Sequence, residues 1–287
     1  MTMSMSPILR FAPSPNGRLH LGHAYSALFT WRAAEILGGT VLLRMEDIDQ
    51  VRCKPEFDLG VREDLAWLGL TWPEPVLRQS QRFPAYAQAC DCLGAMDLLY
   101  PCFCTRKLIA ERASATDPDG APLYPGTCRH LSRAERKARL ASGLAHQWRV
   151  DNARARAMTG PITVSQFSLE GTMTERPAEP EKWGDAVIVR KDTPTSYHLS
   201  VVVDDAFQNV THITRGMDLY HATDLHRLLQ VLLAFPAPLY CHHDLIRDGD
   251  EKLAKSRGAE SLRDLREAGL TAQDVRRRLG FARISSG

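Results

Sequence analysis

The sequence contains no apolar run of the length that a membrane helix requires. A transmembrane helix needs roughly 18–20 consecutive apolar residues, and every apolar run in these 287 residues is much shorter. Residues 1–6 also lack the basic and apolar regions of a secretory signal. We therefore expect a cytoplasmic protein that does not act at a membrane.

The chain also lacks a large excess of charge of either sign. Its 36 Lys and Arg residues and 34 Asp and Glu residues leave a formal net charge of +2. So small a charge does not by itself attract nucleic acid, and a nucleic-acid surface would have to be a local patch. The hydrophobic fraction of 44% is that of an ordinary globular protein, which we expect to be a monomer.

Cysteine is present but does not suit a disulfide framework. The seven cysteines are an odd number, and a reducing compartment disfavours disulfides. Cys102, Cys104 and Cys128 lie close together in the sequence, and three thiolates with one further donor would make a tetrahedral zinc site. Tyr124 or His130 could supply that donor, and composition alone favours His130 because phenolate coordination is rare. The alternative is a group of buried free thiols.

Short apolar runs alternate with amphipathic stretches over most of the chain. This order is typical of a parallel sheet with crossover helices, so the fold class is predicted to be α/β. The expected strands span residues 8–11, 40–45, 186–190, 199–203, 212–214 and 239–241. The expected helices span residues 22–37, 54–68, 82–99 and 222–234, with short helices over 261–281.

The middle of the chain interrupts this alternation. Residues 100–185 are rich in Pro, Gly, Arg and Cys, which predicts an inserted subdomain that carries the metal site. We therefore expect four segments, namely 1–99, 100–185, 186–257 and a short helical tail over 258–287. Cys90 and Cys92 fall on a helical stretch and are expected in the core.

An anion site is predicted where the first strand leads into the first helix. A Pro/Gly turn follows the strand, and the helix begins with His20-Leu21-Gly22-His23. Free backbone N–H groups and the positive end of a helix favour a phosphate at such a point. His20 and His23 add side-chain donors, and Gly22 permits close approach of a ligand.

Two motifs resemble the signatures of class I aminoacyl-tRNA synthetases. The His20-Leu21-Gly22-His23 string is similar to their HIGH sequence, and Lys252-Leu253-Ala254-Lys255-Ser256 is similar to their KMSKS loop. The segment Arg10-Phe11-Ala12-Pro13-Ser14-Pro15-Asn16-Gly17 resembles the glutamyl-tRNA synthetase branch. The resemblance implies a Rossmann-like catalytic core whose two halves, 1–99 and 186–257, are separated by the insertion.

The same resemblance implies roles in amino-acid activation by ATP. His20, Gly22 and His23 would contact the phosphate region, and Lys255 would reach the phosphates from its loop, which Lys252 would support. Such a site stabilises charge on phosphorus with donors and cations, and Mg²⁺ would accompany the ATP. Ala254 departs from the family loop and removes a possible hydroxyl donor.

A glutamate pocket is also implied. Such a pocket must pair the side-chain carboxylate with a guanidinium and the amino group with an acid. By resemblance, the contacting residues are Arg10, Ala12, Ser14, Glu46, Tyr197 and Arg215. The paired arginines suit glutamate better than glutamine. Asp49, Asp204 and Asp205 could be structural or could contact ribose or the amine.

The insertion and the tail indicate which group of glutamyl synthetase-like proteins the chain resembles. Cys102-x-Cys104 and Tyr124-x-x-x-Cys128 resemble the zinc-binding insertion of a small glutamyl synthetase-like family in which tyrosine is the fourth ligand, so Tyr124 is preferred on this ground. About thirty residues follow Ser256, too few for an anticodon-binding domain. Together these features resemble the glutamyl-queuosine tRNA(Asp) synthetases. That resemblance implies activation of L-glutamate without tRNA, then transfer to queuosine at the wobble position of tRNA(Asp).

Two alternatives remain beside this interpretation. A shortened glutamyl-tRNA synthetase would share the first half-reaction but charge the 3′ end of tRNA. A non-catalytic synthetase-like module would bind without reacting, and the retained His20, His23, Lys252 and Lys255 disfavour it.

Overall fold

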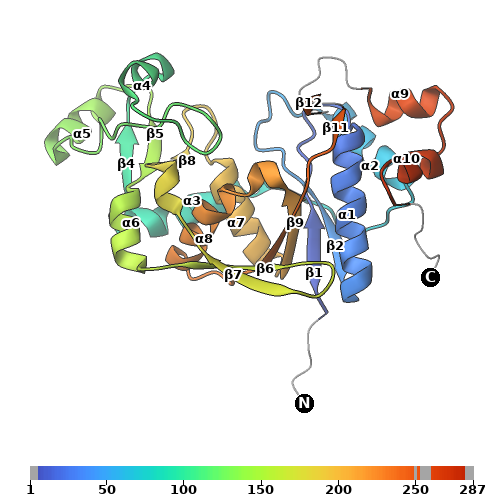
Figure 1. Cartoon of the computed structure of the whole chain (residues 1–287). Coiled ribbons are helices and arrows are strands. Elements are labelled where there is room, and N and C mark those ends of the chain that lie inside the picture. Colours follow the sequence, from blue (N-terminus) through green and yellow to red (C-terminus); the bar gives the residue numbers. More distant parts are fainter. Residues whose placement is uncertain (1–5, 249–250, 253–259, 282–287) are drawn as a thin grey trace.

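The N-terminal part of the chain forms a parallel sheet with crossover helices. The computed structural model describes residues 6–248, 251–252 and 260–281 (Figure 1). Strands β1 (Ile8–Phe11), β2 (Thr40–Met45) and β3 (Leu77–Arg78) pair in parallel in that order. Helix α1 (Leu21–Leu37) joins β1 to β2, and α2 (Pro55–Trp67) lies between β2 and β3. The first two expected strands and the first two expected helices are confirmed.

A second sheet lies beside the first. Strand β10 (Leu239–His243) runs parallel to β9 (His212–Gly216) and to β6 (Thr163–Phe167), and β7 (Met173–Pro177) pairs antiparallel with β6. Helix α8 (Ala222–Leu232) connects β9 to β10. These positions confirm the strands expected over 212–214 and 239–241 and the helix expected over 222–234.

Hydrogen bonds at the start of β1 join the two sheets. The N–H of Thr211, just before β9, donates to the carbonyl oxygen of Ile8 at 2.9 Å. The N–H of Ile8 donates to Oγ1 of Thr211 at 2.9 Å. Because β1 and β9 are neighbours, the carboxyl ends of β1, β2, β9 and β10 share one edge, and α1 contacts β1, β2 and β9. The α/β class with a parallel sheet and flanking helices is confirmed.

A third, antiparallel sheet lies at the end of the molecule opposite the C-terminal helices (Figure 1). It consists of β4 (Leu99–Cys102), β5 (Gln147–Val150) and β8 (Val187–Val189). Helices α4 (Arg106–Arg112) and α5 (Arg133–Ala141) lie at its outer side. The other elements are α3 (Phe83–Ala95), α6 (Asn152–Thr159), α7 (Tyr197–Phe207), α9 (Leu262–Glu267), α10 (Ala272–Arg278), β11 (Arg247–Asp248), β12 (Glu251–Lys252), and 3₁₀ turns η1 (Gln79–Gln81), η2 (Pro180–Trp183) and η3 (Met217–Leu219).

Some expected elements are wrong in type or place. Residues 199–203 form the middle of α7 and not a strand, because a short apolar run buried on all sides suits either structure and Ser196 caps a helix here. The strand expected over 186–190 exists as β8, but it belongs to the antiparallel sheet. The helix expected over 82–99 ends at Ala95, and Asp97 then takes a positive φ of 57° before β4 begins.

The division into four segments stays a prediction. Strands β6 and β7 lie within residues 100–185 but join the sheet of β9 and β10, so this segment contributes to two sheets. None of the described helices is long and apolar enough to cross a membrane. Cys90 is half-buried and Cys92 is exposed, so the expectation that Cys92 lies in the core is wrong.

Candidate functional site

A cavity of about 470 Å³ opens at the edge where the parallel strands end. The carboxyl ends of parallel strands are where α/β sheets place ligand-binding groups. Nine residues singled out from the sequence line this cavity: Arg10, Ala12, Ser14, His20, Gly22, His23, Glu46, Tyr197 and Arg215. The motifs from both halves of the chain therefore meet at one place.

The two motif histidines lie at the start of helix α1, and each accepts a backbone N–H there. Nδ1 of His20 accepts the N–H of Gly22 at 3.1 Å, and Nδ1 of His23 accepts the N–H of His20 at 3.2 Å. Burial lowers the pKa of His20, and burial together with His20 lowers the pKa of His23 to about 4. Both rings are therefore neutral at pH 7, and each carries its proton on Nε2, where it can be donated to a ligand.

A side chain at position 22 would crowd the ring of His20. A Cβ atom at Gly22 would lie 2.9 Å from Cε1 of His20 and 3.1 Å from its Nδ1. The imidazole would have to shift to accommodate it, and the cap of α1 would then change. Gly22 thus fixes the position of the histidine.

One buried carboxylate binds two buried arginines, of which Arg10 lines the cavity. Oδ1 of Asp205, on α7, lies 3.0 Å from Nε of Arg10 on β1 and 2.8 Å from Nη1 of Arg44 on β2. Burial alone would raise the pKa of Asp205, but the charges of Arg10 and Arg44 outweigh it and hold that pKa below its usual value. Asp205 is therefore structural, which answers one question that the sequence left open.

Arg10 and Glu46 present opposite charges to the cavity. Only Nε of Arg10 is hydrogen-bonded within the described part of the chain, so both terminal nitrogens of its guanidinium remain available to a ligand. Glu46 follows β2, and its Oε1 lies 3.4 Å from Nη2 of Arg44. Burial raises the pKa of Glu46 even though Arg44 and Arg10 act to lower it.

Arg215 is buried, and its hydrogen-bond partners in the described part of the chain are all uncharged. Among residues 6–248, 251–252 and 260–281, no carboxylate lies within ion-pair distance of its guanidinium, and the residue is only 4% exposed. It donates instead to His242, to His226 and to Thr223. These bonds use three of its five N–H groups, so two remain for an anion that enters the cavity. A buried cation of this kind is strongly stabilised by an incoming carboxylate.

The histidines around Arg215 are kept neutral. A guanidinium can only donate, so Nδ1 of His226 and Nε2 of His242 must be unprotonated acceptors. Burial and the charge of Arg215 lower the pKa of His242 to about 2 and that of His198 to about 4, and lower that of His226 as well. His198 accepts from His226 across 3.2 Å. Sequence reasoning missed all three histidines, since only the fold brings them together.

The other undecided aspartates are structural. Asp204 accepts hydrogen bonds from Gln79, Arg82 and Tyr86 at 2.6 to 3.0 Å, which fastens α7 to α3. Asp49 is ion-paired with Arg52 at 2.7 Å near the surface. Tyr197 opens α7 beside the cavity, and burial raises its pKa to about 12.

The second motif is only partly described. Lys252 belongs to β12, which pairs with β11, but nothing is described of its side chain. Ala254, Lys255 and Ser256 lie outside the described residues. Before this motif in the sequence, Ile246 lines the cavity. After it, the backbone of Ser261 pairs with that of His20.

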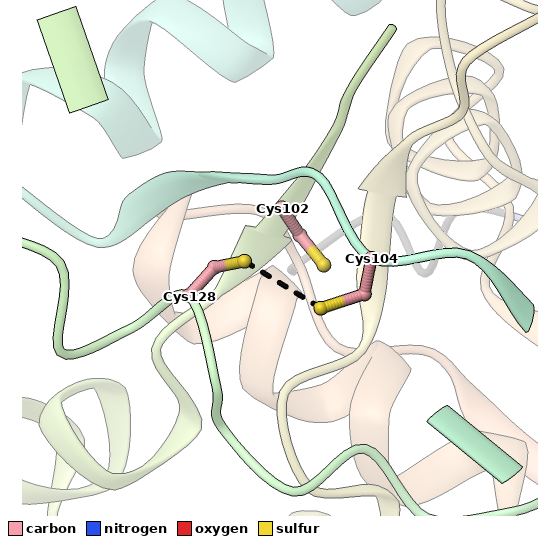
Figure 2. Close-up of side chains that lie close together, drawn as sticks. All are labelled: Cys102, Cys104 and Cys128. Carbon is pink, nitrogen blue, oxygen red and sulfur yellow. Dashed lines mark hydrogen bonds between the residues drawn. The ribbon is translucent and has the colours of Figure 1, made fainter. Parts of the chain in front are cut away.

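Three buried thiols gather between β4 and the loop that precedes α5 (Figure 2). The Sγ atoms of Cys102, Cys104 and Cys128 lie within 4.8 Å of one another, and those of Cys104 and Cys128 are 3.6 Å apart. Oη of Tyr124 lies 4.0 Å from Sγ of Cys104, whereas His130 is exposed and outside this group. The thiols thus form a candidate metal site, and Tyr124 is the better-placed fourth donor.

Comparison with known proteins agrees with this geometry. The chain matches the family "tRNA synthetases class I (E and Q), catalytic domain" over residues 8–280. It is 44% identical over 284 residues to the glutamyl-Q tRNA(Asp) synthetase of Rhodobacter capsulatus, covering 96% of this chain and 100% of that protein. It is also 36% identical to glutamate–tRNA ligase 2 of Syntrophus aciditrophicus, covering 99% of this chain and 59% of that protein.

A solved structure shares the fold. The glutamate tRNA ligase from Elizabethkingia meningosepticum, in complex with its amino acid, superposes with a TM-score of 0.68 at 26% identity. The match covers 92% of this chain and 53% of that chain, so the present chain spans about half the length of that ligase. The Rossmann-like core expected from the motifs is confirmed.

Replacing the shared carboxylate should destabilise the fold strongly. Asp205→Asn leaves Arg10 and Arg44 buried without a counter-charge, and breaking such a buried pair costs about 3–5 kcal/mol. Because the pKa of Asp205 is lowered in the folded protein, its contribution is complete above the unfolded pKa of about 3.9. The difference between wild type and variant should therefore shrink as the pH falls below that value.

Urea denaturation at several pH values measures this effect. Asp49→Asn is the matched control, since its partner Arg52 is largely exposed and such a pair contributes about 0–1 kcal/mol. Equal losses in free energy of unfolding for the two variants would contradict the role given to Asp205.

Proposed function

Because the chain belongs to the class I tRNA synthetase family for E and Q, and within it to the glutamyl-Q tRNA(Asp) synthetases, we propose that it activates L-glutamate with ATP and transfers it to the queuosine of tRNA(Asp). The observation that carries the proposal is the single cavity that holds Arg10, Arg215, Glu46 and the start of α1. The 44% sequence identity to the Rhodobacter relative, over that protein's whole length, supports queuosine of tRNA(Asp) as the acceptor. The expected monomeric state and cytoplasmic location stay predictions.

The charges in the cavity suit glutamate. A guanidinium binds a carboxylate through two parallel hydrogen bonds, and both Arg10 and Arg215 keep N–H groups for this purpose. Glu46 supplies the negative charge that the ammonium group requires, and Ala12, Ser14 and Tyr197 line the remaining surface. An amide in place of the side-chain carboxylate would leave a buried guanidinium without a counter-charge.

The activation step needs positioned donors and no base from the protein. The α-carboxylate of glutamate attacks the α-phosphate of ATP, and pyrophosphate leaves. The neutral His20 and His23 can each donate from Nε2 to phosphate oxygens, and Lys252 and Lys255 would add positive charge. When bound, Mg²⁺ with the ATP neutralises part of the phosphate charge, and the carboxylates of Asp218 and Asp244 line the same cavity.

We further propose that the thiol cluster holds one structural Zn²⁺. Three thiolates and one oxygen donor are a suitable set for a tetrahedral zinc site. Cys102, Cys104, Tyr124 and Cys128 would be the ligands, and the three thiols are already gathered and buried. The ion would join β4 to the loop that leads to α5 and so stiffen the insertion.

The acceptor is identified by labelling. Radiolabelled glutamate, ATP and the protein are incubated separately with tRNA(Asp) that carries queuosine, with tRNA(Asp) that lacks it and with queuosine-free tRNA(Glu). Label is expected only on the queuosine-containing tRNA(Asp), and mass spectrometry should find the glutamyl group on its wobble nucleoside. Label on queuosine-free tRNA(Glu) would instead identify a glutamate–tRNA ligase.

Replacing the guanidinium group of Arg215 by an ammonium group should impair glutamate activation. Arg215→Lys keeps the charge but loses the planar donors, so kcat/KM for glutamate should fall about 100-fold, chiefly through KM. Glutamate-dependent ATP–pyrophosphate exchange measures the effect. Arg227→Lys is the control, because Arg227 lies outside the cavity and bonds to Thr163 and Gln230. A loss of the same size in the control would remove the specific role of Arg215.

Removing the thiols should remove the metal. The triple variant Cys102→Ser, Cys104→Ser, Cys128→Ser is expected to retain no zinc, whereas Cys90→Ser, Cys92→Ser should retain about one ion per chain. Tyr124→Phe should weaken binding, and His130→Ala should not. Metal analysis of purified protein and competition with a chelator give both results. Unchanged zinc in the triple variant would refute the site.

A further inference from the structure

A second cavity lies against the first and is not used by the activation step. Its volume is about 760 Å³, and it opens between the antiparallel sheet with its loops and the start of α7. Tyr197 lines both cavities. The second cavity is also lined by Arg106 and Asp119 from the insertion and by Lys191 from the loop after β8.

This position is the one that the transfer step requires. A hydroxyl oxygen of the acceptor must form an ester bond to the carbonyl carbon of the activated glutamate. The bond from that carbon to the AMP oxygen then breaks, and the hydroxyl proton leaves with a phosphate oxygen or with water. The acceptor must therefore enter beside the glutamate, and Tyr197 is the residue common to the two cavities.

Most charges around this cavity already have partners. Arg190 bonds Asp192 at 3.0 Å, and Nζ of Lys191 donates to the carbonyl oxygen of Cys104 at 3.1 Å. By contrast, the side chains of Arg106 and Asp119 make no ion pair with any residue that the structure describes. Among the described residues, Arg106 and Asp119 are thus a cation and an anion of this cavity whose side chains have neither an ion pair nor a hydrogen bond.

Asp119 lines the second cavity and is exposed to solvent. Burial raises its pKa, and the charges of Asp117 and of Asp218 raise it further. Asp218 lines the glutamate cavity, and Asp119 lines the second cavity. Each cavity therefore carries a carboxylate on its wall.

We propose that this second cavity receives the modified wobble nucleoside, with Asp119 binding the protonated secondary amine that links the base to its cyclopentene diol. The inference rests on the proposed function. The carboxylate of Asp119 can accept a hydrogen bond from the ammonium group of the nucleoside. The guanidinium of Arg106 would bind a phosphate of the tRNA backbone. A cavity of this size accommodates a nucleoside.

Removing the charge of Asp119 should separate the two half-reactions. In Asp119→Asn, glutamate-dependent ATP–pyrophosphate exchange should be unchanged, whereas kcat/KM for glutamylation of queuosine-containing tRNA(Asp) should fall at least about tenfold. Glu111→Gln is the matched control, since Glu111 is exposed on α4 beside Lys107 and does not line the cavity. It should leave both rates unchanged.

Filling the cavity tests the same inference without a change of charge. Ala110→Trp, on the face of α4 that lines the cavity, should block transfer and leave exchange intact. Ala138→Trp, exposed on α5, is its control. Exchange also reports that each variant is folded.

The outcomes distinguish the inference from the function it rests on. If wild type glutamylates queuosine-containing tRNA(Asp) and both cavity variants do so equally well, the nucleoside binds elsewhere. If the variants lose exchange together with transfer, the cavity belongs to the activation site and the inference fails. If wild type exchanges pyrophosphate but labels no queuosine-containing tRNA, the proposed acceptor itself is wrong.

Discussion

The carboxylate of Asp205 is the contact on which the rest of the site depends. It lies on α7, in the second half of the chain, and it binds one arginine from β1 and one from β2 in the first half. One buried carboxylate thus joins residues that are more than 150 positions apart in the sequence. Because Asp205 binds Nε of Arg10, the terminal nitrogens of that guanidinium make no hydrogen bond to the described residues and can bind a ligand. The same contact holds the halves together and orients the binding group.

The sequence was informative where a motif coincides with the end of an element. Residues 8–11 and 40–45 are short, mostly apolar runs followed by polar or turn-forming residues, so both strands and the residues after them, Ser14 and Glu46, were predictable. Parallel strands end at one edge, which explains why these separate motifs converge. Residues 199–203 were misread because an apolar run buried on every side carries no period, and its helix is decided by the cap at Ser196 and by packing against α3 and α8.

What the sequence could not supply are contacts made between distant segments. His198, His226 and His242 look like isolated histidines in apolar surroundings, and only the fold places them around Arg215. The role of Asp204 and Asp205 was likewise undecided until their partners were visible. The thiols were different, because Cys102 and Cys104 are close in sequence and the spacing of Tyr124 and Cys128 matched a known insertion. The second lysine motif remains a sequence inference, since Lys255 lies outside the described residues.

The neutral histidines around Arg215 have a consequence for the range of conditions in which the pocket can operate. None of the three can take up a proton near physiological pH, because each is buried beside a permanent cation. The electrostatic potential at the site of the side-chain carboxylate is therefore supplied by guanidinium groups, whose charge does not vary with acidity. Imidazoles are ordinarily the groups that make a protein sensitive to small changes in acidity. Here they act as uncharged dipoles, so the positive charge that binds the side-chain carboxylate is insulated from such changes.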